Sequence, residues 1–163
     1  MEKQTSDIYK TIVFDLEKHT DKEGAEITSR YHKYTGYKSY GLLTPVLRKL
    51  LKYYKKDIQS LDCKEALLLA EKFYASHIEE QVLAGNYVLQ LHIDSITPAD
   101  FDYLDKMLDH FSSWSQVDDI CVEGGKVLNS LLIKYPKKTI ALLKKWNKSK
   151  NMWKRRASIV PFT

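Results

Sequence analysis

Apolar residues recur along most of the chain at the three- and four-residue spacing of amphipathic helices, and no stretch stands out with the alternation of a β-strand. The pattern predicts helices at residues 6–19, 22–34, 44–56, 63–75, 77–92, 97–110, 113–135, 136–147 and from 150 onward. The one long interruption is Tyr34–Gly41, "YTGYKSYG", with two glycines and three tyrosines. We expect it to be a loop whose tyrosines suit a contact surface.

Two of the predicted helix starts carry a threonine before a proline, Thr44 before Pro45 and Thr97 before Pro98. A threonine hydroxyl at the N-cap accepts a hydrogen bond from an otherwise free amide. Proline suits the first helical position, because the amide hydrogen that it lacks would have no partner there. Pro136 similarly predicts a boundary between two helices.

Short connections between successive helices predict antiparallel neighbours. The pairs 63–75/77–92, 97–110/113–135 and 136–147/150–163 recur at roughly 35 to 40 residues, near the HEAT period of ~40–47. We therefore expect an all-α fold, an α-solenoid of HEAT-like antiparallel helix pairs, in a single domain over residues 1–163. The final segment, "NMWKRRASIVPFT", contains apolar residues up to its end and lacks the polar closing repeat that a solenoid needs. We therefore expect a chain truncated at its C-terminal end, or a partner that covers this end.

Composition excludes several classes of protein. The 163 residues are 44% hydrophobic and 29% charged, as in a globular domain, and no apolar run approaches the ~20 residues that span a bilayer. The N-terminus lacks the apolar segment of a secretory signal, so we expect a cytoplasmic protein. Cys63 and Cys121 lack CxxC spacing and are expected to be buried free thiols. The histidines show no metal-ligand spacing, so we expect neither a metal nor a cofactor.

Charge is unevenly distributed along the chain. Residues 94–123 contain eight acidic side chains and one lysine, whereas residues 124–163 contain eleven lysines and arginines and no acid. This asymmetry indicates a polyanionic partner for the C-terminal part, although a solvated helical surface gives the same pattern.

The stretch "FSSWSQVDDICVEGG", residues 111–125, begins the predicted helix 113–135. Ser113 followed by Gln116 predicts a capping box with Trp114 as the first helical residue. The apolar stripe of this helix consists of Val117, Ile120, Cys121, Gly124, Leu128, Leu131 and Tyr135.

The helical phase separates the two adjacent aspartates of this stretch. At about 100° per residue, Trp114 lies about 60° and Asp118 about 100° from the stripe, while Asp119 points nearly opposite to it. We therefore expect Asp119 to face solvent and Asp118 to lie at the core margin, with Gly125 permitting close approach on the same flank. A carboxylate beside a tryptophan at the core margin fits a functional site, but an ordinary helix-start aspartate, favoured by the macrodipole, is the commoner reason for these residues.

The final segment repeats this arrangement with a basic residue. Trp153, Ala157 and Val160 form its apolar stripe, Arg156 borders the stripe, and Lys154 and Arg155 face away. Arg156 can offer a fork of donors to a phosphate, although surface arginines without such a role are common.

Three segments taken together resemble the DNA alkylation repair family of AlkD-like DNA glycosylases: "YHKYTGYKSYGLLTPVLRKLLK", "FSSWSQVDDICVEGG" and "KSKNMWKRRASIVPF". The resemblance runs from about Tyr31 to the end and rests on the Trp-x-x-x-Asp and Trp-x-x-Arg motifs. It implies a HEAT-like solenoid that excises N3- and N7-alkylated purines. It assigns Asp118 as the catalytic carboxylate, Trp114 as the aromatic that packs on the deoxyribose, and Arg156 as the grip on the adjacent backbone.

The resemblance also implies a lesion held within the duplex, so that no deep pocket is needed, and a further tryptophan in a later repeat that this chain does not reach. The partner implied is double-stranded DNA that contains alkylated bases. We expect the protein to be a monomer and not to bind a membrane. The residues expected to contact DNA are Arg156, Arg155, Lys154, Lys150, Lys148, Tyr40 and Arg48. Two alternatives stay open: a non-catalytic protein that recognises damaged, bent or branched DNA, and a protein-interaction scaffold.

Overall fold

The computed structural model describes residues 2–32, 36–122 and 124–163, and these residues form an all-α fold without a β-strand. The α-helices are α1 (Glu2–Lys18), α2 (Lys22–Tyr31), α3 (Thr44–Tyr53), α4 (Lys55–Gln59), α5 (Cys63–Tyr74), α6 (Glu79–Leu91), α7 (Phe101–Met107), α8 (Trp114–Cys121), α9 (Val127–Lys134), α10 (Pro136–Asn147) and α11 (Met152–Ala157). Short 3-10 helices occupy Pro98–Asp100, Leu108–His110 and Val160–Phe162. The predicted all-α class is confirmed.

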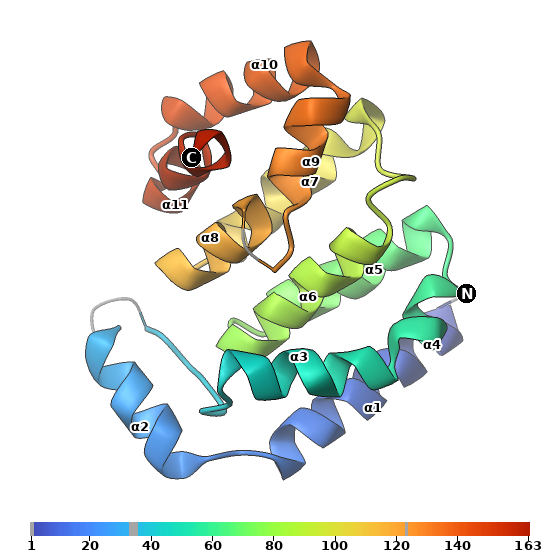
Figure 1. Ribbon diagram of the computed structural model, residues 1–163, viewed down its shortest axis with the longest axis vertical. Helices are drawn as coiled ribbons and strands as arrows, with labels where there is room; N and C mark the ends of the chain where they lie inside the picture. The colour runs from blue at the N-terminus through green and yellow to red at the C-terminus, as the bar shows by residue number, and fades with distance from the viewer. Residues whose placement is uncertain (1, 33–35, 123) are drawn as a thin grey trace.

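Helices α1 to α4 lie toward the end of the molecule that holds the N-terminus, α5 and α6 lie in the middle, and α7 to α11 form the end that holds the C-terminus (Figure 1). The most extensive pair is α5 with α6, and α1 packs on α5. Helix α8 packs against α6, α9 and α11, and α10 packs against α9 and α11. The helix that carries the candidate aspartates therefore lies between the central pair and the C-terminal helices.

The hydrophobic core runs continuously from α1 to α11. Its largest fully buried side chains include Phe73 and Tyr74 of α5 and Trp146 of α10. Burial of such apolar surface is the main term that stabilises a helical domain of this size. The described helices include none that is long and apolar enough to cross a membrane.

The predicted single helix 113–135 is wrong, because α8 ends at Cys121 and α9 begins at Val127. The turn between them contains Gly124 and Gly125, which disfavour helix. Lys126 has the left-handed φ of 50°, and its amide and that of Gly125 donate to the carbonyl of Asp119 at 3.1 and 2.9 Å. The chain therefore folds back over Asp119 instead of continuing the helix.

Of the two threonine caps, one is confirmed and one is wrong. Thr97 caps the 3-10 turn before α7, with its hydroxyl accepting from the amide of Ala99 at 3.3 Å. Thr44 is instead already helical, because the carbonyl of Leu43 accepts from the amides of Val46 and Leu47.

Other helix ends also differ from the sequence pattern. The segment 44–56 is divided at Tyr54 into α3 and α4, and the last helix is confined to Met152–Ala157. The predicted end of the second helix, at residue 34, lies outside the described residues. From Gly36 to Gly41 the chain forms the expected loop, tied to the start of α6 where the carbonyl of Lys38 accepts from the amide of Glu79 at 2.8 Å.

Candidate active site

Helix α8 begins as its sequence predicts, with a small difference in the cap. Ser113 is the N-cap, and its hydroxyl oxygen accepts from the amide of Gln116 at 3.2 Å. The side chain of Gln116 bonds the amide of Ser112 at 2.8 Å, not that of Ser113, so the reciprocal bond of the capping box falls one residue early. Glu79 at the start of α6 accepts hydrogen bonds from Ser113, Ser115 and Gln116 and thereby fixes this turn.

Asp118 and Arg156, 38 residues apart in sequence, form a two-point ion pair. Arg156 Nε donates to Asp118 Oδ1 at 2.8 Å and Nη2 donates to Oδ2 at 2.6 Å. The Asp118 side chain is 16% exposed and that of Arg156 is 43% exposed. The hydrogen bond with Asp118 raises the pKa of Arg156. Such fork geometry holds a carboxylate in one orientation while leaving further lone pairs on its oxygens.

Trp114 lies one turn before Asp118 on the same helix and is 52% exposed. Its ring centroid lies 5.9 Å from that of His32, which stacks on Tyr37 at 4.2 Å. The Asp118–Arg156 pair therefore joins α8 to α11, with Trp114 one helical turn before Asp118 on α8.

Asp119 is buried, and the prediction that it faces solvent is wrong. Its Oδ2 accepts from Asn86 Nδ2 at 2.9 Å, and its Oδ1 accepts from the amide of Gly124 at 3.1 Å and from Arg48 Nη2 at 3.4 Å. Burial raises the pKa of Asp119, against the opposing effects of Asn86 and Arg48. The helical-phase argument failed because it assumed one long helix with one buried face, whereas α8 is short and packed between α6 and α11.

The close approach expected at Gly125 is confirmed. A Cβ there would lie 2.9 Å from the carbonyl oxygen of Asp119 and 3.3 Å from Cβ of Asn86. A Cβ on Gly124 would likewise clash with the carboxylate of Asp119 and with Arg48. Both glycines therefore leave room for the buried polar network around Asp119.

The family model described as "DNA alkylation repair enzyme" matches residues 12–163. The chain belongs to the DNA alkylation repair enzyme family. No curated protein matches the chain significantly. Membership in this family supports a role in DNA repair, an enzymatic activity in general and DNA as the substrate.

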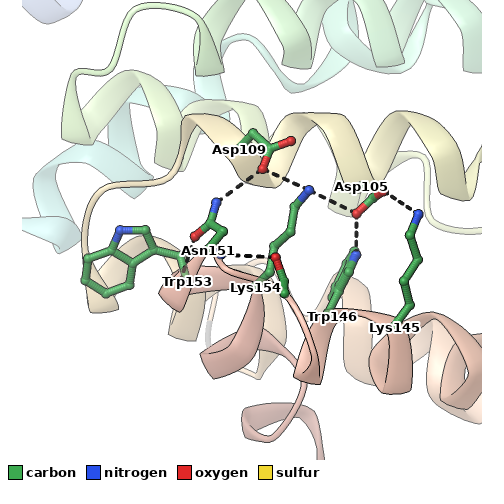
Figure 2. Close-up of polar contacts among 8 residues, drawn as sticks. Asp105, Asp109, Lys145, Trp146, Asn151, Trp153 and Lys154 are labelled. Atoms are coloured by element: carbon green, nitrogen blue, oxygen red, sulfur yellow. Dashed lines mark hydrogen bonds and ion pairs between the residues drawn. The ribbon is translucent and has the colours of Figure 1, made fainter.

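In this member of the DNA alkylation repair family, Lys154 is buried, so the expectation that it faces solvent is wrong. Figure 2 shows it between two aspartates: Lys154 Nζ lies 3.0 Å from Asp105 Oδ1 and 2.9 Å from Asp109 Oδ1. Lys145 and Trp146 also donate to Asp105, at 2.7 and 2.6 Å. The acidic run that precedes α8 thus neutralises part of the basic run that follows it, and Lys154 joins α11 to the end of α7.

The other basic residues expected to contact DNA remain exposed. Lys148, Lys150 and Arg155 lie around the turn between α10 and α11, where Arg155 Nη1 donates to the carbonyls of Ser149 and Lys150 at 2.7 and 2.8 Å. Arg48 is 48% exposed while it contacts Asp119. Each of these four residues keeps a charge at the surface that is able to meet a phosphate.

Tyr40 has a different environment from the one expected. It is half-buried, and its hydroxyl oxygen accepts from Gln81 Nε2 at 2.7 Å. Its amide donates to Glu80 Oε2 at 2.8 Å. These contacts hold the loop against α6, which makes Tyr40 a support of the fold rather than a free surface aromatic.

Sequence reasoning missed the buried polar residues of α6. Glu79, Glu80 and Asn86 are all buried and hydrogen-bonded to the loop, to α8 or to Tyr74. Two adjacent glutamates at a helix start are also favoured by the macrodipole alone, so the sequence carries no signal that distinguishes the two roles.

Within the described residues, no group of three potential metal ligands is present. Cys121 is buried as expected, and burial raises the pKa of its thiol, whereas Cys63 is only half-buried. A thiol with a raised pKa is a poor nucleophile at neutral pH, so the cysteines add no chemistry to the site.

Proposed function

We propose that this protein is a DNA glycosylase that hydrolyses the glycosidic bond of N3- and N7-alkylated purines in duplex DNA. The observation that carries the proposal is Asp118, a largely buried carboxylate held on both oxygens by Arg156, one turn from the half-exposed Trp114.

The chemistry of this substrate fits a fixed carboxylate. An N3- or N7-alkylated purine already carries positive charge, so it departs without a strong general acid. The sugar then becomes oxocarbenium-like, and a preorganised carboxylate stabilises that developing charge. The lone pairs that Arg156 leaves free on Asp118 are able to face the sugar or to orient water, while the Trp114 ring adds cation–π attraction.

Binding of the duplex is assigned to the exposed cations near this site. Arg156 adjoins Asp118 directly, and its Nη1 is not used in the pair with Asp118. Lys148, Lys150 and Arg155 extend the positive surface along the turn between α10 and α11. Phosphate contacts of this kind make binding strongly dependent on salt.

Release of free base from alkylated duplex DNA tests the proposal. The protein is expected to release 7-methylguanine or 3-methyladenine in proportion to time and protein concentration. If it releases neither, while an established alkylpurine glycosylase does so on the same DNA, the proposed reaction is wrong.

A non-catalytic DNA-binding protein is the second candidate, and one observation favours it. An aspartate bonded on both oxygens to arginine is also what a purely structural ion pair between α8 and α11 looks like. That function predicts salt-sensitive binding to damaged or bent duplex that Asp118→Asn leaves unchanged, without any base release.

A further inference from the structure

Helix α11 carries Arg156 and is only six residues long. A helix of this length has little stability of its own, so its contacts with neighbouring helices decide where it lies. The buried side chains of α11 are those of Lys154 and Ala157. A charged residue is therefore one of the two buried side chains that hold α11 in the fold.

Lys154 and Arg156 hold α11 from different sides. They are two positions apart in a helix, so their side chains leave the helix axis about 200° apart. Lys154 Nζ contacts Asp105 of α7 at 3.0 Å and Asp109 of the following 3-10 helix at 2.9 Å (Figure 2). Arg156 contacts Asp118 of α8. Helix α11 is therefore held between two sets of carboxylates.

Asp109 also fixes the start of α11. Asn151 is the N-cap of this helix, and its Oδ1 accepts from the amide of Trp153 at 2.9 Å. The Nδ2 of the same Asn151 donates to Asp109 Oδ1 at 3.2 Å (Figure 2). Asp109 Oδ1 thus contacts both the N-cap residue and Lys154, which restricts sliding and rotation of α11.

The ion pair between Lys154 and Asp105 is sheltered from water. The side chain of Lys154 is 9% exposed and that of Asp105 is 18% exposed. Apolar side chains of similar volume often stabilise a fold as well as a buried ion pair does, whereas the ion pair requires a defined geometry. Such a contact therefore suits a helix whose position must be held closely.

We propose that Asp109 and Lys154 are positioning residues, which fix α11 so that Arg156 meets Asp118 at two points. Neither residue has to touch the substrate in this role. A carboxylate stabilises the cationic sugar only while it is correctly placed, and a displacement of about 1 Å costs on the order of 100-fold in rate. The effect on base release rests on the proposed glycosylase function, whereas the link from Asp109 to Arg156 is a property of the fold.

Single-turnover base release by Asp109→Ala, at saturating protein, tests the effect on catalysis. The Asp109 side chain is 56% exposed, and Lys154 keeps its contact with Asp105, so the variant is expected to fold. We expect release to slow roughly 10-fold. In an Arg156→Lys background the same substitution should add no further loss, because its effect passes through Arg156. A milder variant, Asp109→Asn, should change the rate in the same direction.

Lys145→Met is the matched control. Lys145 binds Asp105 in the same cluster at 2.7 Å, but it belongs to α10 and its side chain is 62% exposed. This variant removes an ion pair of the cluster without loosening α11. It should therefore release base within about twofold of the wild-type rate.

Hydrogen exchange at Arg156 Nε, followed by NMR, tests the link without base release. This proton is bonded to Asp118 Oδ1, and its signal is assigned by its absence from Arg156→Lys. We expect exchange with water about tenfold or more faster in Asp109→Ala and unchanged in Lys145→Met.

The outcomes separate this inference from the proposed function. Wild-type rates of release and exchange in Asp109→Ala overturn the positioning role. Slower release that persists in the Arg156→Lys background, or that comes without faster exchange at Arg156, overturns it as well. If the wild-type protein releases no base, the glycosylase proposal fails, while faster exchange at Arg156 in Asp109→Ala still supports the link between the two residues.

Discussion

Asp118 and Asp119 are neighbours in sequence with different surroundings. Asp118 is 16% exposed and is held by a single arginine, with lone pairs left over, whereas Asp119 is enclosed by Asn86, Gly124 and Arg48. The first arrangement suits a group that meets a substrate, and the second suits a group that holds a turn in place.

If Arg156 positions Asp118, the rate of base release should depend on the two-point contact of its guanidinium group more than on its positive charge. Arg156→Lys keeps a cation but loses the two-point contact, because an ammonium group lacks the planar fork. We expect single-turnover base release to fall roughly 10- to 100-fold while DNA affinity changes little. A lysine variant that releases base at the wild-type rate would show that the two-point contact has no role in positioning Asp118.

Asp119→Asn should act on stability. An amide in place of the carboxylate presents a donor where Asn86 or the amide of Gly124 requires an acceptor, so we expect the free energy of unfolding to fall by about 1–3 kcal/mol. Urea denaturation checks this, with Asp102→Asn on the exposed face of α7 as the matched control, expected to stay within about 0.5 kcal/mol of wild type. Equal stability of the two variants would contradict the role given to Asp119.

At the scale of helices, the cluster around Asp105 joins α7 to α10 and α11 (Figure 2). Burial alone would raise the pKa of Asp105, but hydrogen bonds from Lys145, Lys154 and Trp146 prevail and lower it. A lowered pKa means that the folded protein favours the ionised form. The stability that Asp105 contributes is therefore present above its unfolded pKa and is lost as the pH falls through the folded value.

This sign leads to a prediction for Asp105→Asn. The variant should be less stable than wild type at pH 7, and the difference should shrink as the pH is lowered below about 4, where the wild-type carboxylate becomes protonated. Denaturation at a series of pH values measures the difference. A gap that stays constant or widens toward acid would show that the ion pairs of Asp105 do not stabilise the fold.

The pattern of apolar positions predicted most helices but missed the interruptions inside them. The predicted stripe passes from Cys121 through Gly124 to Leu128, but Gly124 and Gly125, whose amides donate to Asp119, interrupt the helix there. Apolar periodicity indicates which residues prefer burial. It does not indicate that the carboxylate of Asp119 accepts a hydrogen bond from the amide of Gly124 in the following turn. Lys154 was misplaced for a related reason, since its partners Asp105 and Asp109 lie on another helix.

At the scale of the whole molecule, the basic C-terminal part is only partly available to DNA. Lys150 is exposed, whereas Lys154 is buried by its aspartates. We expect Lys150→Gln to weaken DNA binding and to reduce the slope of log affinity against log salt by about 0.9.

Lys154→Gln should leave this slope unchanged and instead lower the free energy of unfolding by about 2–4 kcal/mol. Identical effects of the two variants on the salt slope would contradict this division.

Base release by Asp118→Asn tests the central claim most directly. The variant keeps the shape of the side chain and removes the charge that would stabilise the cationic sugar, so single-turnover release of 7-methylguanine from alkylated duplex should fall by about 100-fold or more. DNA affinity should be unchanged or slightly higher, because a negative charge near phosphates is removed. Asp102→Asn is the control and should release base at the wild-type rate. Release by Asp118→Asn at that same rate would contradict the assignment of Asp118 as the catalytic carboxylate.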